Sequence, residues 1–337
     1  MNEQIERAGE VTRVKHRKVV LHVVAGIVAG MIAGAAAAED YPVRPIRVIT
    51  NTSAGGLSDI FARAVGEELR KDWGQPLIVD NRPGGSQNVG TRACSDSKGD
   101  GYTICILNAD SIVYNQFLFK QIPFDPEHGI VPVTNLYHLI QTLVVNASLK
   151  VSTVDELIAL SKQTPGTLSY LTASPPLALY MEKLKTEKGA DWVRVPFRGG
   201  GEAVNSIMNG SSPIGLIGIG NVTGHLNAGT MTALAMLNNI RSPQFPKVPT
   251  LEETGYHGAA SRSWYGLFVP PRTPRPIIDK LAAEFAKIVN EPAFREKNLY
   301  SRGLVPAINT PDEFAADIKH DRVVAQQVVK DAGLEPQ

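Results

Sequence analysis

The sequence predicts an α/β protein of two units, each built on a doubly wound, mostly parallel sheet. Segments of strand composition alternate with amphipathic helical segments in two successive runs. The chain has 337 residues, which is more than one hydrophobic core usually supports. Apolar residues make up 43% and charged residues 20%, a composition that excludes disordered and collagen-like classes.

The first run holds short strands of β-branched and apolar residues with helices between them. Ser58 or Asp59 is expected to cap the first helix, because a small polar side chain at this position accepts a hydrogen bond from the first turn. In chain order, the expected elements are strand 46–50, helix 58–69, strand 77–79, helix 87–95 and strand 102–107.

The second run repeats the alternation. Thr153 and Glu156 form a capping box, and Thr310 and Glu313 form another at the start of the last helix. The segment 173–176 is expected to be a loop. The expected elements are strand 143–145, helix 153–160, strands 167–172 and 192–195, helix 202–208, strand 214–219, a helix near 221, strand 264–269, helix 274–290 and a helix from 310.

Residues 1–38 have the pattern of a secretory signal. Residues 1–18 carry five basic side chains, and the uncharged run 19–38 ends in four alanines. We expect cleavage near Ala38 and a mature protein outside the cytoplasm. A membrane anchor is the alternative, because an uncharged run of about 20 residues is long enough to span a bilayer.

Composition also limits the chemistry. The net charge of +1 gives no basic footprint for nucleic acid, and two cysteines cannot supply a four-ligand zinc site. Outside the cytoplasm Cys94 and Cys105 can be oxidised, but their simplest interpretation is as buried apolar side chains on a helix and the following strand.

The common catalytic motifs are missing from the sequence. It has no phosphate-binding loop, no HExxH and no GxSxG. The glycine string from Gly218 to Gly224 lacks the acidic residue that a dinucleotide site needs about 20 positions later, and the histidines have no metal-binding spacing. We therefore expect no catalytic residues, no metal and no cofactor.

Four loops that follow expected strands are rich in Gly, Ser, Thr and Asn: 52–56, 84–86, 172–174 and 197–200. In open α/β sheets, ligands bind at the carboxyl ends of the strands. Backbone N–H groups at a helix start favour an anion. Gly-rich turns also occur in any doubly wound fold, but four of them in two units favour a site for a small carboxylate.

The chain resembles the periplasmic receptors of tripartite tricarboxylate transporters, the Bug-type receptors, from Tyr41 to about Glu335. Order and spacing carry the resemblance more than any single string. The matching strings are Tyr41-Pro42-x-Arg44-Pro45-Ile46-Arg47, Gly55-Gly56-x-Ser58-Asp59, Asp80-Asn81-Arg82-Pro83-Gly84, Asn88-Val89-Gly90, Asp100-Gly101-Tyr102-Thr103, Val144-Val145-Asn146, Glu156-Leu157-Ile158-Ala159-Leu160, Pro165-Gly166-Thr167-Leu168, Val195-Pro196-Phe197-Arg198-Gly199-Gly200 and Ser263-Trp264-Tyr265-Gly266-Leu267-Phe268.

The resemblance implies a two-lobed type II binding-protein fold with a hinge between the lobes. Lobe 1 is expected to comprise 41–139 and 264–337, and lobe 2 to comprise 140–263. It also implies a monomer that closes on a small organic acid and presents it to membrane permease subunits. The ligand-binding residues carried over from the family are Ser53, Ala54, Gly55, Asp59, Thr172, Ser174, Phe197, Arg198 and Gly199.

Some positions depart from the family pattern. Ser53 and Ala54 stand where two prolines are usual, and the third strand ends in Asn108-Ala109-Asp110 instead of small polar residues. An ionised Asp110 in the site repels a second carboxylate unless it is paired. We therefore expect a monocarboxylate with an apolar or aromatic body, or a ligand with a donor group for Asp110. The alternative is that Asp110 faces solvent.

Two other functions stay open at this level. The same fold serves as a ligand sensor for a membrane kinase. A secreted hydrolase would need a Ser or Thr beside a His, which the sequence alone cannot place.

Overall fold

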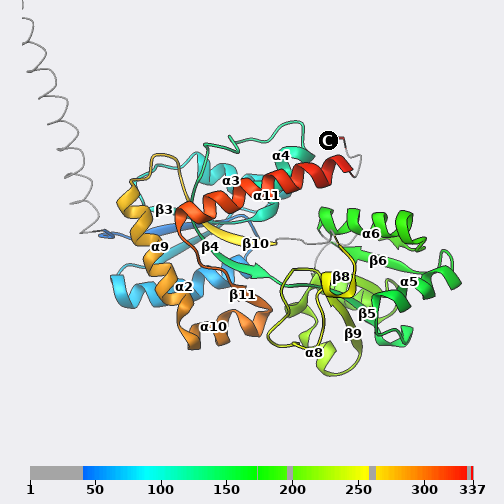
Figure 1. Cartoon of the computed structure of the whole chain (residues 1–337). Helices are drawn as coiled ribbons and strands as arrows, with labels where there is room; N and C mark the ends of the chain where they lie inside the picture. Colours follow the sequence, from blue (N-terminus) through cyan, green and yellow to red (C-terminus); the bar gives the residue numbers. More distant parts are fainter. Residues whose placement is uncertain (1–40, 173, 196–199, 258–262, 332–334, 337) are drawn as a thin grey trace, which may run out of the picture.

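The computed structural model describes residues 41–172, 174–195, 200–257, 263–331 and 335–336. Within these residues the chain forms two lobes side by side, each a β-sheet with helices on both faces (Figure 1). The expected signal peptide at 1–38 lies outside the described residues. No helix within the described ranges is both long and apolar enough to cross a bilayer.

Lobe 1 contains a six-stranded sheet in the order β11-β4-β10-β3-β1-β2. Alternate residues of its strands point into two separate apolar clusters, so both faces of the sheet are buried. The strands are β1 (Ile46–Thr50), β2 (Leu77–Asn81), β3 (Thr103–Asn108), β4 (Val131–Leu139), β10 (Trp264–Val269) and β11 (Leu304–Pro306).

Helices α2 (Leu57–Trp73), α9 (Arg275–Asn290) and α10 (Pro292–Asn298) cover one face of this sheet. Helices α3 (Asn88–Ser95) and α11 (Pro311–Asp331) cover the other. In Figure 1, α2, α9 and α10 lie below the sheet, and α3 and α11 lie above it. Shorter helical segments complete the lobe: η1 (Gly85–Gln87), the π-helical turn η2 (Asp110–Tyr114), α4 (Asn115–Leu118) and η6 (Tyr300–Arg302).

Lobe 2 contains a five-stranded sheet in the order β7-β6-β8-β5-β9. One apolar cluster packs α5 and α6 against it, and a second packs α7 and η4 on the other face. The strands are β5 (Gln141–Asn146), β6 (Ser169–Thr172), β7 (Val193–Arg194), β8 (Ile214–Gly218) and β9 (Met231–Met236). The helical segments are η3 (Ala147–Leu149), α5 (Val154–Gln163), α6 (Pro175–Lys188), α7 (Gly200–Met208), η4 (Ile219–Asn221), α8 (Thr223–Asn227) and η5 (Glu252–Thr254).

Both sheets are mixed, and the two passages of the chain between the lobes explain why. Strands β1, β2 and β3 are parallel, and so are β6, β7 and β8. β5 and β10 are the first strands after each passage. For this reason each begins at the end of its sheet that faces the other lobe. Each therefore runs antiparallel to its neighbours, β5 to β8 and β10 to β3.

The lobes meet around Ile140, the residue that separates β4 from β5. Its N–H donates to Gly303 O at 3.2 Å, and its carbonyl accepts from Ile219 N at 2.9 Å. Beside it, a Cβ built on Gly220 of lobe 2 would come within 2.1 Å of Arg302 O of lobe 1. The two backbones therefore touch directly at this point.

The two capping boxes are confirmed. Glu156 N donates to Thr153 Oγ1 at 3.1 Å, and Glu313 N donates to Thr310 Oγ1 at 3.2 Å. Two other local predictions are wrong. Gly56, and not Ser58 or Asp59, is the N-cap of α2. The expected loop at 173–176 instead opens α6 at Pro175, because a proline in the first turn has no N–H that the helix must satisfy.

The interpretation of the two cysteines as simple apolar side chains is also wrong. Both are buried, but Cys94 of α3 and Cys105 of β3 form a disulfide. The bond ties the helix to the central part of the sheet, and it closes a loop with a sequence separation of 11 residues.

The disulfide yields the first prediction. We expect Cys94→Ala combined with Cys105→Ala to lower the free energy of unfolding by about 2–3 kcal/mol, the usual effect of releasing a loop of this length. Urea denaturation of the two proteins measures the difference. A reductant should destabilise the native protein and leave the double variant unchanged, and equal sensitivity of both proteins would contradict the prediction.

Candidate ligand-binding site

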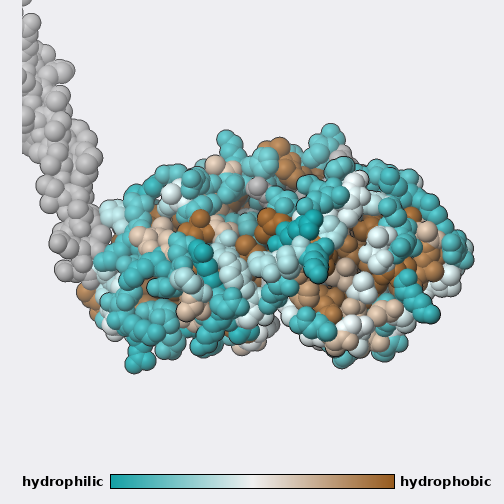
Figure 2. Space-filling view, turned by 60° about the horizontal axis from the view of Figure 1, so that its bottom comes forward, coloured by the Kyte–Doolittle hydropathy of each residue, from teal (hydrophilic) through white to brown (hydrophobic). Residues whose placement is uncertain are grey.

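The strand directions bring the carboxyl ends of the two sheets to the same place. The chain leaves lobe 1 at Leu139, the carboxyl end of β4, and enters lobe 2 at Gln141. Gln141 pairs with Gly218, the last residue of β8, and β6 is parallel to β8. The carboxyl ends of both sets of strands therefore face one another across the junction, where the outline of the molecule narrows (Figure 2).

Five predicted residues lie at the lobe 1 edge. Ser53, Ala54 and Gly55 are exposed in the loop after β1. Asn108 ends the parallel neighbour β3, and Asp110 follows it in η2.

At the lobe 2 edge, Thr172 ends β6 and Ser174 precedes α6. The structure thus puts predicted residues of both lobes on facing edges. Phe197, Arg198 and Gly199 lie outside the described residues.

The loop after β1 is held in shape by its own polar groups. Asn81 Nδ2 donates to Thr50 Oγ1 at 2.8 Å and to Thr52 O at 3.3 Å, and the Thr52 hydroxyl is hydrogen-bonded to Ser58. Gly55 has φ +79°, a conformation that strongly favours glycine. The loop therefore presents a fixed backbone at the edge of the sheet.

Asp59 belongs to this loop's internal bonding. Its carboxylate accepts two hydrogen bonds from Arg63, at 3.1 and 2.9 Å, and one from Gly55 N at 3.0 Å. These bonds, from Arg63 first, lower the pKa of Asp59. The charge of Asp59 is balanced by Arg63 within lobe 1, and its side chain is only 5% exposed. Asp59 therefore stabilises the loop and does not present an unpaired negative charge to a ligand.

A chain of buried amides lies behind this edge. Asn51 Nδ2 donates to Asn108 Oδ1 at 2.9 Å and to Ser111 Oγ at 3.0 Å. Asn108 Nδ2 in turn donates to Gln87 Oε1 at 2.7 Å. Sequence reasoning missed Asn51 and Gln87. The sequence does contain one signal for the position of Asn51, the glycine at position 90 inside α3. A Cβ at Gly90 would come within 2.7 Å of Asn51 Cα, so glycine lets this helix pack directly against Asn51.

The turn that supplies Gln87 has an unusual backbone. Gly84, Gly85, Ser86 and Gln87 all have positive φ, at 112°, 54°, 51° and 72°. Ser86 and Gln87 carry side chains, so each costs about 1–2 kcal/mol in this region. Surrounding bonds hold them there: Asn115 Nδ2 donates to Ser86 O at 2.8 Å, and Gln87 accepts from Asn108. Such strain is typical of binding sites.

Asp110 differs from Asp59. No residue in the described ranges forms an ion pair with it, and its one hydrogen bond is a long one from Asn108 Nδ2 at 3.4 Å. Burial raises the pKa of Asp110 to about 6. Its charge reaches the phenols of Tyr114 and Tyr265, where it raises the pKa after the larger effect of burial. The site therefore holds one neutralised and one unneutralised carboxylate.

Among the described residues, the lobe 2 edge is built around Thr172, Ser174 and the start of α6. Thr172 is buried, and its Oγ1 accepts from Ser174 N at 3.2 Å. Helix α6 starts here, but its first two residues are Pro175 and Pro176, which have no N–H. The polar side chains that the structure describes at this edge, Thr172 and Ser174, both carry hydroxyls.

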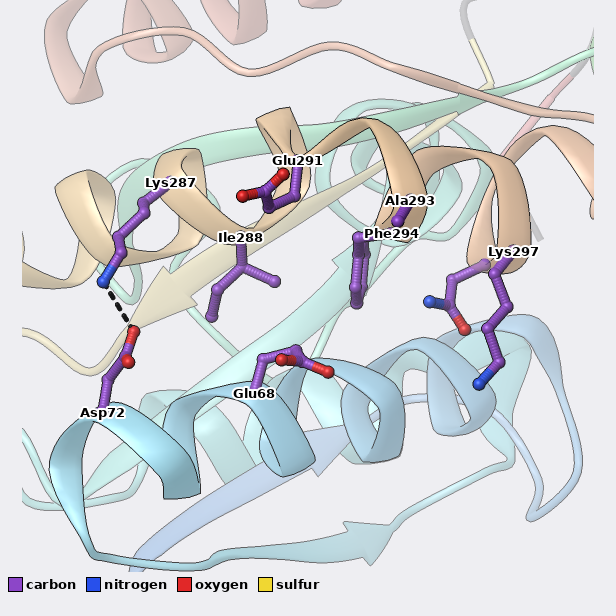
Figure 3. A pocket seen from close by; sticks show the side chains of 9 residues that line it. Glu68, Asp72, Lys287, Ile288, Glu291, Ala293, Phe294 and Lys297 are labelled. Carbon is purple, nitrogen blue, oxygen red and sulfur yellow. Dashed lines mark hydrogen bonds and ion pairs between the residues drawn. The ribbon is translucent and has the colours of Figure 1, made fainter.

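The described residues also form pockets, one of about 600 Å³ lined by Ser86, Val89 and Phe119 and one of about 390 Å³ beside Arg44. No group of three or more metal-binding side chains occurs within the described ranges. A pocket of about 350 Å³ lies between α2, α9 and α10 and contains the ion pair Lys287–Asp72 (Figure 3). It involves the last two turns of α2, at the end of the helix away from the β1 loop, so it is remote from the facing edges.

Two α/β lobes joined by paired crossings, with polar loops on facing strand ends, define a two-lobed solute-binding receptor. The model of the "Tripartite tricarboxylate transporter family receptor" matches residues 61–334. The chain belongs to this family, which confirms the resemblance and the fold class predicted from the sequence.

Similar proteins agree with this assignment. Protein BugT of Bordetella pertussis is 32% identical over 287 residues, which cover 83% of this chain and 88% of BugT. A solved periplasmic transporter is 30% identical, with a TM-score of 0.77, over 88% of this chain and 99% of its own. The R. palustris protein Rpa4515, solved with adipate, is 26% identical, with a TM-score of 0.78, over 88% of this chain and 100% of its own.

The half-buried carboxyl of Asp110 yields the second prediction. Because its native pKa of about 6 exceeds its ordinary value of 3.8, the native state retains a proton that the unfolded state loses between these values. Asp110 therefore costs stability progressively as pH rises from about 4 to about 6. We expect Asp110→Asn to be more stable than the native protein at pH 7.5, by on the order of 2 kcal/mol, and to lose this advantage towards pH 4.

Urea denaturation at several pH values measures the difference. Asp100→Asn is the matched control, because Asp100 lies just before β3 and is exposed and paired with Arg44 at 3.0 Å. A stability difference for Asp110→Asn that does not change with pH would contradict the assignment.

Proposed function

We propose that this receptor captures a small carboxylate between its lobes in the periplasm and delivers it to the membrane permease subunits of a tripartite tricarboxylate transporter. The observation that carries the proposal is the pair of facing strand ends, rich in hydroxyl and amide groups. The adipate with which Rpa4515 was solved supports the ligand class, since that protein is 26% identical to this chain.

The proposed division puts 41–139 and 264–337 in lobe 1 and 140–263 in lobe 2. The strand order supports it, because β1 to β4, β10 and β11 share one sheet and β5 to β9 share the other. The proposed ligand-binding residues are Ser53, Ala54, Gly55, Asn108, Asp110, Thr172, Ser174, Phe197, Arg198 and Gly199, with Asp59 acting by holding Gly55.

Affinity in this proposal comes from closure. A ligand drives two lobes together only if it makes contacts in the closed state that the open state lacks. The fixed loop after β1 would hold the ligand first, and the hydroxyls of Thr172 and Ser174 would reach it as the lobes close. The closed, monomeric complex is then the form that a permease recognises.

Secretion belongs to the same proposal. Removal of residues 1–38 would release the mature receptor into the periplasm. The Cys94–Cys105 disulfide supports this location, because such bonds persist in oxidising compartments and are rare in the cytosol.

The alternatives have less support. A hydrolase needs a hydroxyl activated by a histidine. Thr230 Oγ1 lies 3.4 Å from His225 Nδ1, but this exposed pair lies at the start of β9, away from the lobe junction, and the threonine also bonds to the carbonyl of His225 at 3.2 Å. A kinase-linked sensor would have the same ligand site, and a gene for permease subunits or for a kinase beside this one separates the two roles.

The third prediction tests the site. We expect small carboxylates to raise the melting temperature of the mature protein, because a ligand that binds only the native state stabilises it. Thr172→Val keeps the shape of the side chain but removes its hydroxyl, and should weaken binding of the best carboxylate by about tenfold. Isothermal titration measures the affinity.

The matched control is Thr230→Val, the same change at the outer end of lobe 2, which should bind as the native protein does. Equal affinity in Thr172→Val would remove Thr172 from the site. If no carboxylate changes the melting temperature, the proposed ligand class is wrong.

A further inference from the structure

Asp110 occupies the middle of the lobe 1 edge. It follows β3, which lies between β10 and β1 in the sheet. The carboxyl ends of β1 and β3 and the beginning of β10 lie on the edge that faces lobe 2. Its neighbours in η2, Ser111, Ile112 and Val113, are buried, so the backbone of the turn is fixed against the core. The turn therefore holds Asp110 at a fixed position on this edge.

The side-chain amides near Asp110 are already engaged elsewhere. Asn108 Nδ2 gives its shorter hydrogen bond, 2.7 Å, to Gln87 and only the 3.4 Å bond to Asp110 Oδ2. Asn51 Nδ2 is divided between Asn108 and Ser111. A carboxylate accepts up to about four hydrogen bonds. Asp110 Oδ1 accepts none in the described residues, although it is not sealed inside the protein.

The contrast with Asp59 shows that this is not a general feature of the edge. Asp59 has Arg63 and the N–H of Gly55, which together complete its bonding. The charged or titratable groups that Asp110 affects are the phenols Tyr114 and Tyr265, and neither can neutralise it. Within the described residues, Asp110 therefore has no cation to balance its charge.

A ligand with only carboxylates and carbon would leave Asp110 unpaired and would be repelled where its own charge came near. We propose that Asp110 determines specificity, by selecting a carboxylate ligand that also carries a hydrogen-bond donor, an ammonium or a hydroxyl group. The ligand's carboxylate lies against the hydroxyls and amides of the facing loops, and its donor lies against Asp110. This inference rests on the proposed function.

The test uses series of acids that differ only in the donor: succinate, malate and aspartate; propionate, lactate and alanine; and 3-phenylpropionate, phenyllactate and phenylalanine. Isothermal titration of the mature protein gives each affinity. In the series that binds, the donor-bearing acids should bind at least about tenfold more tightly than the plain acid, the usual effect of a hydrogen bond to a charged group.

Asp110→Asn should then reduce this preference to less than about threefold, with the plain acid gaining affinity while the ammonium acid loses it. Opposite changes within one variant cannot come from lost stability, which affects every ligand alike. Asp100→Asn, at the other end of β3, should keep the native preference.

The outcomes separate the two proposals. Plain acids that bind the native protein as tightly as their donor-bearing partners overturn the role of Asp110 and leave the carboxylate receptor intact. The same holds if Asp110→Asn weakens every acid equally. If no member of any series binds, the proposed function fails, and the inference fails with it.

Discussion

The passage from β4 to β5 through the single residue Ile140 is the constraint on which the arrangement of the molecule depends. Leu139 ends one sheet and Gln141 begins the other, so the edges where these strands end and begin must be adjacent. The return passage before β10 repeats the constraint. Together they turn the carboxyl ends of both sets of parallel strands toward one another, so that the loops at those ends face each other, as the proposed site requires.

The two halves differ in how they are built. The lobe 1 half is held by the disulfide, by the amides of Asn51 and Asn108 and by a strained turn, all of which fix the backbone before any ligand arrives. Among the described residues, the lobe 2 edge has short polar side chains at the end of β6 and a helix whose first two residues have no N–H. The described bonds that fix loop geometry therefore lie mainly on the lobe 1 edge.

Local features of the fold could be predicted from the sequence. The capping boxes at Thr153 and Thr310 involve residues three positions apart. Strand 46–50 is rich in β-branched residues, and strand 264–269 is mostly apolar. β4 was missed because Pro132 and several polar residues interrupt its pattern, and it is a strand because β10 and β11 pair with it from more than 100 residues away. Pairing of this kind leaves no local signal.

The candidate site follows the same rule. The loop residues at strand ends could be proposed from composition and resemblance. The disulfide and the Asn51–Asn108–Gln87 chain could not, because each depends on how α3 packs against β1 and β3. The state of Asp110 likewise depends on which cations the fold brings near it, and the sequence contains arginines without showing their positions in space.

The close contact between Gly220 and Arg302 has a mechanical consequence. A side chain at Gly220 would collide with the backbone of the other lobe, so the lobes are already at their minimum separation there. We therefore expect a change in the angle between the lobes to pivot near this point. In such a rotation the lobes would move least beside Ile140 and most at the ends of the facing edges farthest from it. A rotation of a few degrees would there be enough to admit or enclose a small molecule.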